Sequence, residues 1–222
     1  MMVEDAVKYT SRSRAIIFIN LMTFGATFTN IAFKLANANG VSAVDYQIFR
    51  GFFICLFVIP FLLAFKKHPV KDVPEGRYPL VFLRGFLGTI NFIFYMWAMT
   101  LLPMYLAVIL NNLSPFWASV LGTAVNGDRF YMLEFLAMAI CFACVIGITL
   151  VKPSDSEEAL TGKTYDTFWL GIIVSIIKSI ISAFVGVTSR RAKEIHFTVL
   201  MSYNGLIGFT VPMLGMGIYY WS

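Results

Sequence analysis

The sequence predicts an all-α integral membrane protein with about seven transmembrane helices. Three observations support this prediction: the composition, the spacing of the apolar runs and the distribution of the basic residues. Apolar residues make up 59% of the 222 residues and charged residues only 13%, whereas soluble globular proteins have about 45–50% apolar and about 25% charged residues. A soluble fold of this length could not bury so much apolar surface, but a lipid bilayer accommodates it.

Seven apolar runs are long enough to cross a bilayer, which takes about 20 mostly apolar residues in a helix. In chain order they are 15–36, 46–65, 78–102, 104–126, 131–151, 167–187 and 197–219. Pro103 separates the third run from the fourth, because proline cannot continue a helix and disfavours helical backbone in the preceding residue. The one long connection, within 152–166, is polar and acidic, and we expect it to link two halves of the protein.

The chain therefore divides into an N-terminal segment 1–14, a first helical half 15–152, an acidic linker 153–166 and a second part 167–222. The N-terminal segment is short, polar and of mixed charge. It resembles neither a signal peptide nor a transit peptide.

Basic residues predict the orientation in the membrane. With the N-terminus on the cytosolic, positive side, eleven loop lysines and arginines lie on that side, and only Lys152 and Lys163 lie on the other. Cytoplasmic loops carry this excess of positive charge, so we expect the N-terminus inside and the C-terminus outside. The same bias accounts for the net charge of +5 without a nucleic-acid partner. The lipid bilayer is the expected partner.

Cysteine and histidine give no sign of a metal site, a disulfide framework or a cofactor. Cys55, Cys141 and Cys144 are odd in number and lie inside apolar runs, while His68 and His196 fall in polar connections. We interpret the Cys141–Cys144 pair as small side chains on one helix face. An intramembrane enzyme is disfavoured as well, since the sequence has no Ser/His/Asp set, no HExxH motif and no paired aspartates within a run.

Four cations fall within the apolar runs, where an ionisable group costs several kcal/mol unless it is paired, hydrated or able to reach the interface. Lys34 lies near a helix end and can extend to the interface. Arg50 has Asp45 as a possible ion-pair partner, and Arg84 lies about two turns from the inner end of its helix. Lys178 lies in the middle of its run, where a water-filled cavity explains it best.

Helical periodicity places most polar residues of four runs on one face each. These faces hold Asn20, Thr23, Thr27, Asn30 and Lys34 in the first run; Arg84, Gly88, Asn91 and Tyr95 in the third; Asn112, Pro115, Ser119 and Thr123 in the fourth, with Asn111 and Ser114 beside them; and Gly171, Ser175, Lys178 and Ser182 in the sixth. Polar side chains facing lipid are costly, so the four faces should turn toward one another. They line either a solvated cavity, which we favour, or closely packed helix interfaces, where small and polar residues are also common.

The favoured reading makes eight residues candidates for solute binding and one a conformational hinge. The candidates are Arg84, Asn91, Tyr95, Asn111, Asn112, Lys178, Asn20 and Asn30. The hinge is Pro115, whose missing N–H frees the carbonyl of Asn111 and kinks the fourth helix.

Motifs in the third to fifth runs resemble the EamA-type repeat of the drug/metabolite transporter superfamily, closest to the G-type branch of the solute carrier 35 group. The similar residues there are Leu83-Arg84-Gly85, Gly88, Tyr95, Ala98, Leu102-Pro103, Ala107, Ser114-Pro115, Gly127-Asp128-Arg129, Gly147 and Val151-Lys152-Pro153. Phe49-Arg50 also fits the start of the family's second helix. Asp128 departs from the pattern, because the family usually has glutamate in this turn.

The resemblance implies ten helices in two inverted five-helix repeats, a central solute site and alternating access, as in many carriers. This chain would then hold one complete repeat and the first two helices of a second, inverted repeat. The second repeat is traceable in the spacing of Lys34 to Tyr46 and of Arg191 to Tyr203, twelve residues in each case.

We therefore expect a carrier of a small polar organic solute, with an anion favoured because Arg84 and Lys178 supply positive charge. Because the sequence stops after the second helix of the second repeat, we expect a fragment of a longer chain, or a short form whose bundle a partner subunit or second copy completes. The alternative is a shortened, non-transporting relative that serves as a structural subunit of a membrane complex.

Overall fold

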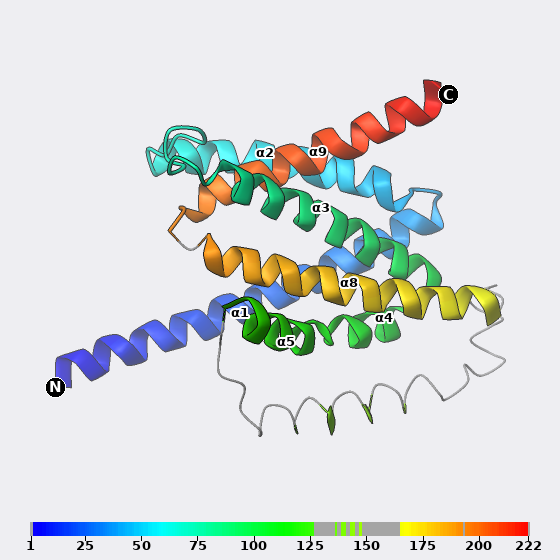
Figure 1. The fold of residues 1–222 in the computed structure, drawn as a ribbon, viewed down its shortest axis with the longest axis horizontal. Coiled ribbons are helices and arrows are strands. Elements are labelled where there is room, and N and C mark those ends of the chain that lie inside the picture. The colour runs from blue at the N-terminus through cyan, green and yellow to red at the C-terminus, as the bar shows by residue number, and fades with distance from the viewer. Residues whose placement is uncertain are drawn as a thin grey trace. The chain divides into compact units, whose positions relative to one another are not determined.

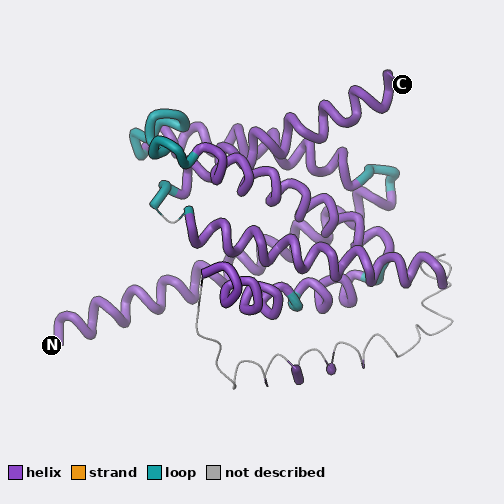
Figure 2. The backbone as a smooth tube through the Cα atoms, in the orientation of Figure 1, coloured by secondary structure: helices purple, strands orange, loops and turns teal. Residues whose placement is uncertain are grey.

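The computed structural model describes residues 2–126 and 165–221 apart from 193, together with isolated positions between 136 and 147. The regular elements in these stretches are α-helices, and no strand occurs in them (Figures 1 and 2). The chain divides into two units, Met1–Val41 and Ser42–Ser222. The predicted helix 131–151 and the predicted linker 153–166 fall outside the described residues, except for isolated positions and the start of the next helix.

The first unit is one long helix, α1 (Met2–Ala38). It contains the predicted run 15–36 but begins near the N-terminus, because residues 2–14 hold no proline or glycine that would interrupt a helix. The segment predicted as separate is therefore helical from residue 2. Polar side chains of α1 bond to its own backbone: Asn20 Nδ2 donates to the carbonyl of Ile16 at 2.9 Å, and Thr27 Oγ1 to that of Thr23 at 3.0 Å.

The second unit begins with α2 (Ala43–Ala64) and α3 (Tyr78–Leu101), close to the predicted bounds. A capping box starts α2: Asp45 N–H donates to Ser42 Oγ at 3.1 Å, and Ser42 N–H donates to Asp45 Oδ2 at 3.1 Å. These bonds satisfy backbone donors that a helix start leaves without partners. A proline in its first turn begins α3, and the helix ends just before Pro103.

The predicted single helix 104–126 is two helices in the structure, α4 (Met104–Asn111) and α5 (Ser114–Asn126). Asn112 and Leu113 form the turn between them. Pro115 lies in the first turn of α5, where its missing N–H leaves no bond unmade. One helix therefore ends and a new helix begins just before Pro115, whereas the sequence predicted a single helix kinked at this proline.

Two long helices complete the unit: α8 (Tyr165–Arg191) and α9 (Phe197–Trp221). They extend the predicted runs 167–187 and 197–219 by a few residues. Helix α3 packs on both of them; α9 also packs on α2, and α8 also packs on α4 and α5 (Figure 1).

Glycines allow α2 and α9 to pack closely. A Cβ on Gly51 would lie 2.5 Å from the backbone N of Phe209 and 2.6 Å from the carbonyl carbon of Gly208. Small residues of this kind let helix backbones approach each other in membranes.

Five stretches of the described residues are long and apolar enough to cross a membrane: Ala43–Ala64, Tyr78–Leu101, Met104–Thr123, Thr167–Arg191 and Phe197–Ile218. The prediction of an all-helical protein with several transmembrane helices is confirmed. The number seven and the repeat layout stay predictions.

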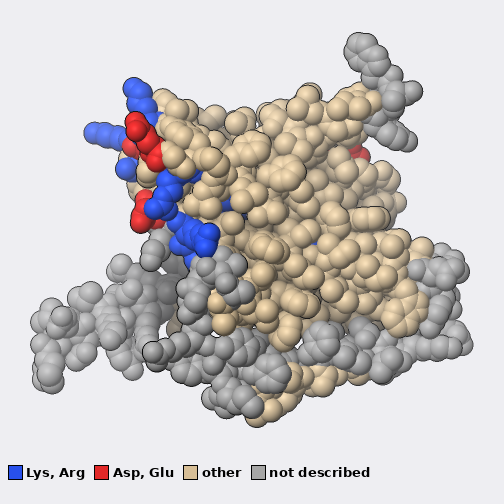
Figure 3. Space-filling model, in the orientation of Figure 1, with Lys and Arg blue, Asp and Glu red and all other residues tan. Residues whose placement is uncertain are grey.

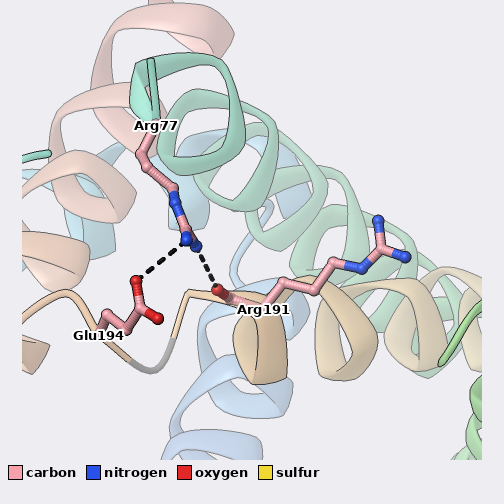
Figure 4. Close-up of polar contacts among 3 residues, drawn as sticks. All are labelled: Arg77, Arg191 and Glu194. Carbon is pink, nitrogen blue, oxygen red and sulfur yellow. Dashed lines mark hydrogen bonds and ion pairs between the residues drawn. The ribbon is translucent and has the colours of Figure 1, made fainter. Parts of the chain in front are cut away.

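On the face shown in Figure 3, most charged side chains of the described residues gather at one end. Arg77, at the start of α3, forms an ion pair with Glu194 of the α8–α9 turn at 3.0 Å. Its Nη1 also donates to the carbonyl of Arg191 at 3.1 Å (Figure 4). The structure thus brings Arg77 and Arg191, two of the loop cations that predicted the orientation, to the same end of the unit.

Candidate functional site

Helices α3 and α8 meet through their polar faces at two levels. Near the start of α3, Arg84 Nε donates to Ser189 Oγ at 2.6 Å. Farther along α3, the ring of Tyr95 lies under Lys178, with the ammonium nitrogen 4.7 Å from the ring centroid. The two helices run antiparallel (Figure 1), so these contacts mark two levels of one shared face. Three predicted site residues, Arg84, Tyr95 and Lys178, thus lie in this interface.

Lys178 is the most unusual residue of the interface. Its side chain is buried, with the residue only 5% exposed. The described residues provide it with no carboxylate and no hydrogen-bond acceptor, and the Tyr95 ring is its charge-stabilising contact. A lysine at the centre of a transmembrane helix costs about 2.5–3.5 kcal/mol, and a cation–π contact returns about 0.5–2 kcal/mol. An anion or water beside Lys178 would supply the remainder.

Several buried polar atoms of this unit have no hydrogen-bond partner among the described residues. They are Asn91 Oδ1 on α3, Asn111 Oδ1 on α4, Ser175 Oγ on α8, Trp117 Nε1 on α5 and Asn204 Oδ1 on α9. A buried polar group without a partner costs about 1–3 kcal/mol. Native structures rarely keep several such groups unless water or a ligand satisfies them.

The same helices also contain polar side chains that are fully engaged. Ser179 Oγ lies 2.9 Å from both the Leu110 and the Ser175 carbonyls and connects α8 to α4. Thr89 Oγ1 donates to the Gly85 carbonyl within α3 at 3.0 Å. These residues behave as helix-packing residues. Packing residues and candidate binding residues therefore occur side by side on these helices. Among the described residues, the Ser175 hydroxyl has no hydrogen-bond partner and the Lys178 ammonium contacts only the Tyr95 ring.

Gly88 makes room at the level of Arg84, near the start of α3. A Cβ at this position would lie 2.7 Å from Asn204 Oδ1 and 2.9 Å from Arg84 Nη1. The missing side chain therefore lets the arginine head and the amide of α9 approach the α3 backbone. Ser189 holds the other edge of the guanidinium and itself donates to the Val185 carbonyl at 2.6 Å.

The sequence suggested an ion pair between Arg50 and Asp45, but the structure gives Arg50 other partners. Asp45 accepts hydrogen bonds from Ser42 at the start of α2 and forms no ion pair with Arg50. The Arg50 guanidinium instead lies over the Phe92 ring, 3.9 Å from its centroid. Its Nη1 donates to Gln47 Oε1 at 3.3 Å.

The other predicted site residues lie elsewhere. Asn112 is exposed in the turn between α4 and α5, and Pro115 is exposed in the first turn of α5. Asn20 and Asn30 lie on α1, in the other unit. Three further polar residues of the site were not predicted from the sequence: Gln47, Ser189 and Asn204. Each lies close to a helix end among other polar residues, where it does not stand out. For Asn204 a signal exists, because Tyr203-Asn204 has the same amide-after-tyrosine pattern as Tyr46-Gln47.

No group of three His, Cys, Asp or Glu side chains in the described stretches is placed to hold a metal ion. The polar groups described at the α3–α8 face are cations, amides, hydroxyls and an aromatic ring.

Comparison with known proteins gives one match. The model of the EamA-like transporter family matches residues 7–150, which is more than half of the chain and covers α1 from residue 7 and all of α2 to α5. The comparisons with curated proteins and with solved structures gave no match.

Proposed function

Because the chain belongs to the EamA-like transporter family, within the drug/metabolite transporter superfamily, we propose that it carries a small polar organic anion across a membrane by alternating access. Membership makes it a multi-pass membrane protein of a family that transports small solutes. The charge of the solute, the mechanism, and a position near the G-type branch of the solute carrier 35 group are our proposals.

Lys178 is the observation that carries the choice of an anion. Its ammonium group is buried at mid-helix with an aromatic ring as its electrostatic partner and no carboxylate in the described part of the chain. Charged groups in transmembrane helices usually mark substrate or ion pathways. Asn91, Asn111 and Ser175 add buried polar atoms that have no partner and can bond a polar solute. Tyr95 would orient the ammonium group toward it.

Two helices support the inverted-repeat layout through their sequences. Segments 46–52 of α2 and 203–209 of α9 share a pattern: tyrosine, a side-chain amide, three residues, glycine and phenylalanine. If the two repeats are 15–152 and 167–222, these segments hold equivalent places in the second helix of each.

Equivalent residues of the two segments also contact each other. Gly51 packs against Gly208, and the rings of Phe52 and Phe209 lie 6.2 Å apart between centroids. The two helices run in opposite directions (Figure 1). Contact between equivalent residues of antiparallel helices is what a two-fold axis between inverted repeats produces. The helix pair thus supports this layout.

Packing at the end of the unit that holds Arg77 and Glu194 supports alternating access. Buried Val73, Val81, Ala192, Ile195 and Val199 form a cluster between the start of α3 and the α8–α9 turn. The nearby ion pair of the α3 start with this turn is exposed to solvent, and exposed pairs contribute only about 0–1 kcal/mol. This end is therefore closed in the structure by a small apolar cluster and one weak ion pair, and alternating access would require both to separate. We propose that it is the cytosolic end, with the N-terminus on the same side.

The test is uptake by the purified chain in proteoliposomes. The probes are radiolabelled succinate, citrate and glucose 6-phosphate as anions, with glucose as the neutral solute and choline as the cation. We expect uptake of at least one anion and none of choline. Lys178→Met keeps the side-chain length and removes the charge, so it should abolish that uptake. Ile177→Met, on the exposed face of the same helix, is the matched control and should transport normally.

Two results would contradict the proposal. Uptake of an anion at the wild-type rate by Lys178→Met would show that the lysine is not part of the path. Absence of uptake for every probe, in a chain that unfolds cooperatively, would instead favour a non-transporting structural subunit.

A further inference from the structure

Arg50 on α2 is a second, half-buried cation that the proposed site leaves unexplained. The structure pairs it with a ring, that of Phe92, at 3.9 Å and with one amide oxygen, Gln47 Oε1, at 3.3 Å. An arginine side chain has five N–H donors, and the described residues accept from one of its nitrogens. Asp45, the carboxylate nearest along α2, is engaged by Ser42. Arg50 therefore keeps a positive charge that no described carboxylate neutralises, and most of its N–H donors have no acceptor among the described residues.

Gln47 fixes the position of Arg50. It is 1% exposed, and its Nε2 donates to the carbonyl of Gly208 on α9 at 3.3 Å. Gly208 leaves the space that this amide fills, since a Cβ there would lie 2.5 Å from Gln47 Nε2. The α9 backbone thus holds Gln47, and Gln47 holds the guanidinium over Phe92. A cation held in this way is preorganised for an anion, because little side-chain entropy remains to be lost on binding.

The two cation–ring contacts lie next to each other on α3. Phe92 and Tyr95 are three residues apart, a spacing that makes them neighbours on one helix face, about 4.5 Å apart along the axis. Arg50 approaches the first ring from α2, and Lys178 approaches the second from α8. Two positive charges thus contact neighbouring rings of α3 from two different helices, and no carboxylate of the described residues neutralises either of them.

We propose that Arg50, positioned by Gln47 over Phe92, forms a second anion-binding subsite beside Lys178, and that the carrier takes a solute with two anionic groups. This inference rests on the proposed function, since Lys178 binds the first group. Two cations of like charge repel each other without a ligand, whereas a dianion neutralises both. The guanidinium suits a carboxylate or phosphate group, because it can donate two parallel hydrogen bonds.

The test compares dicarboxylates with monocarboxylates of the same chain length. Thermal unfolding of the purified chain in detergent is followed at constant ionic strength with malonate, succinate and glutarate, and with propionate, butyrate and valerate. We expect at least one dicarboxylate to stabilise the wild type at about tenfold lower concentration than its monocarboxylate partner, as a second charge-assisted hydrogen bond would give. Arg50→Gln should remove this preference while stabilisation by the monocarboxylate persists, which also shows that the variant is folded. Lys178→Met should weaken both.

Three further variants separate the roles. Arg50→Lys keeps the charge without the bidentate geometry and should keep part of the preference. Gln47→Leu should weaken dicarboxylate binding only, as expected of a positioning residue. Lys71→Gln, in the exposed loop between α2 and α3, removes a charge away from the site and should change nothing.

The outcomes distinguish the inference from the proposed function. An unchanged dicarboxylate preference in Arg50→Gln, or equal stabilisation of the wild type by both acids of each pair, would overturn the second subsite and leave the anion carrier standing. No stabilisation by any of the six acids would overturn both.

Discussion

Replacing Gly51 with alanine should push helices α2 and α9 apart. The new Cβ would lie 2.5 Å from the Phe209 nitrogen, 2.6 Å from the Gly208 carbonyl carbon and 2.8 Å from the Gly208 oxygen. Ordinary carbon contacts lie at about 3.5–4.0 Å. All three atoms are backbone atoms, so no side-chain rotation relieves the clash, and the helices must separate by about 1 Å at this point.

The cost of this separation has two parts. Overpacking in a well-packed interior costs about 1–3 kcal/mol. The Gln47–Gly208 hydrogen bond, already 3.3 Å long, would weaken and lose up to about 1 kcal/mol. Alanine's better helix propensity returns up to about 1 kcal/mol. We therefore expect Gly51→Ala to lower the free energy of unfolding by about 1–3 kcal/mol.

The assay is reversible unfolding in mixed micelles with increasing sodium dodecyl sulfate, followed by circular dichroism. The matched control is Gly215→Ala on α9, where a Cβ would meet nothing within 4 Å, so the free energy should stay constant or rise slightly. If the two variants unfold within about 0.5 kcal/mol of each other, as unrelated surface changes do, the close α2–α9 contact is wrong.

Further predictions concern Lys178, Arg84 and the topology. Lys178→Met should raise the free energy of unfolding by about 1–3 kcal/mol, measured in the same micelles, because it removes a transmembrane charge and loses only a ring contact. Ser189→Ala should lower it by about 1–3 kcal/mol, because a charged donor of Arg84 loses its partner; an unchanged value would argue against the 2.6 Å hydrogen bond. His68→Cys and Glu194→Cys should be labelled by a membrane-impermeant thiol reagent from the same side of sealed vesicles, and labelling from opposite sides would refute the placement of both loops at one end.

Much of the helical layout could be predicted because its boundaries are local. Ser42 caps the start of α2, Pro103 ends α3, and apolar runs define the lengths in between. The break at Asn112 and Leu113 could not be predicted in the same way. A proline such as Pro115 is compatible with either a kinked helix or a new helix start, and packing against α8 decides between them.

The charged residues of the candidate site could be predicted from the sequence, whereas its uncharged polar residues were harder to predict. Arg84 and Lys178 were found because a cation in an apolar run needs an explanation, whichever helix it faces. Asn111 and Asn112 look equivalent in the sequence, yet one has a buried oxygen and the other is exposed. Neighbouring residues point about 100° apart on a helix, so only the packing of helices distant in sequence determines which one is buried.

Water access to Ser175 tests the central claim, a polar path through the helices beside Lys178, most directly. In a background with Cys55, Cys141 and Cys144 replaced by alanine, Ser175→Cys would be treated with a charged, membrane-impermeant methanethiosulfonate in proteoliposomes. Ser175 is 2% exposed and its hydroxyl lacks a partner, so the thiol should react only if water reaches it during the carrier's cycle. We predict that it reacts, because the reactive thiolate forms in water, and that Ile177→Cys, on the exposed apolar face of the same helix, does not. An inert Ser175→Cys, or a faster reaction of Ile177→Cys, would contradict the polar path.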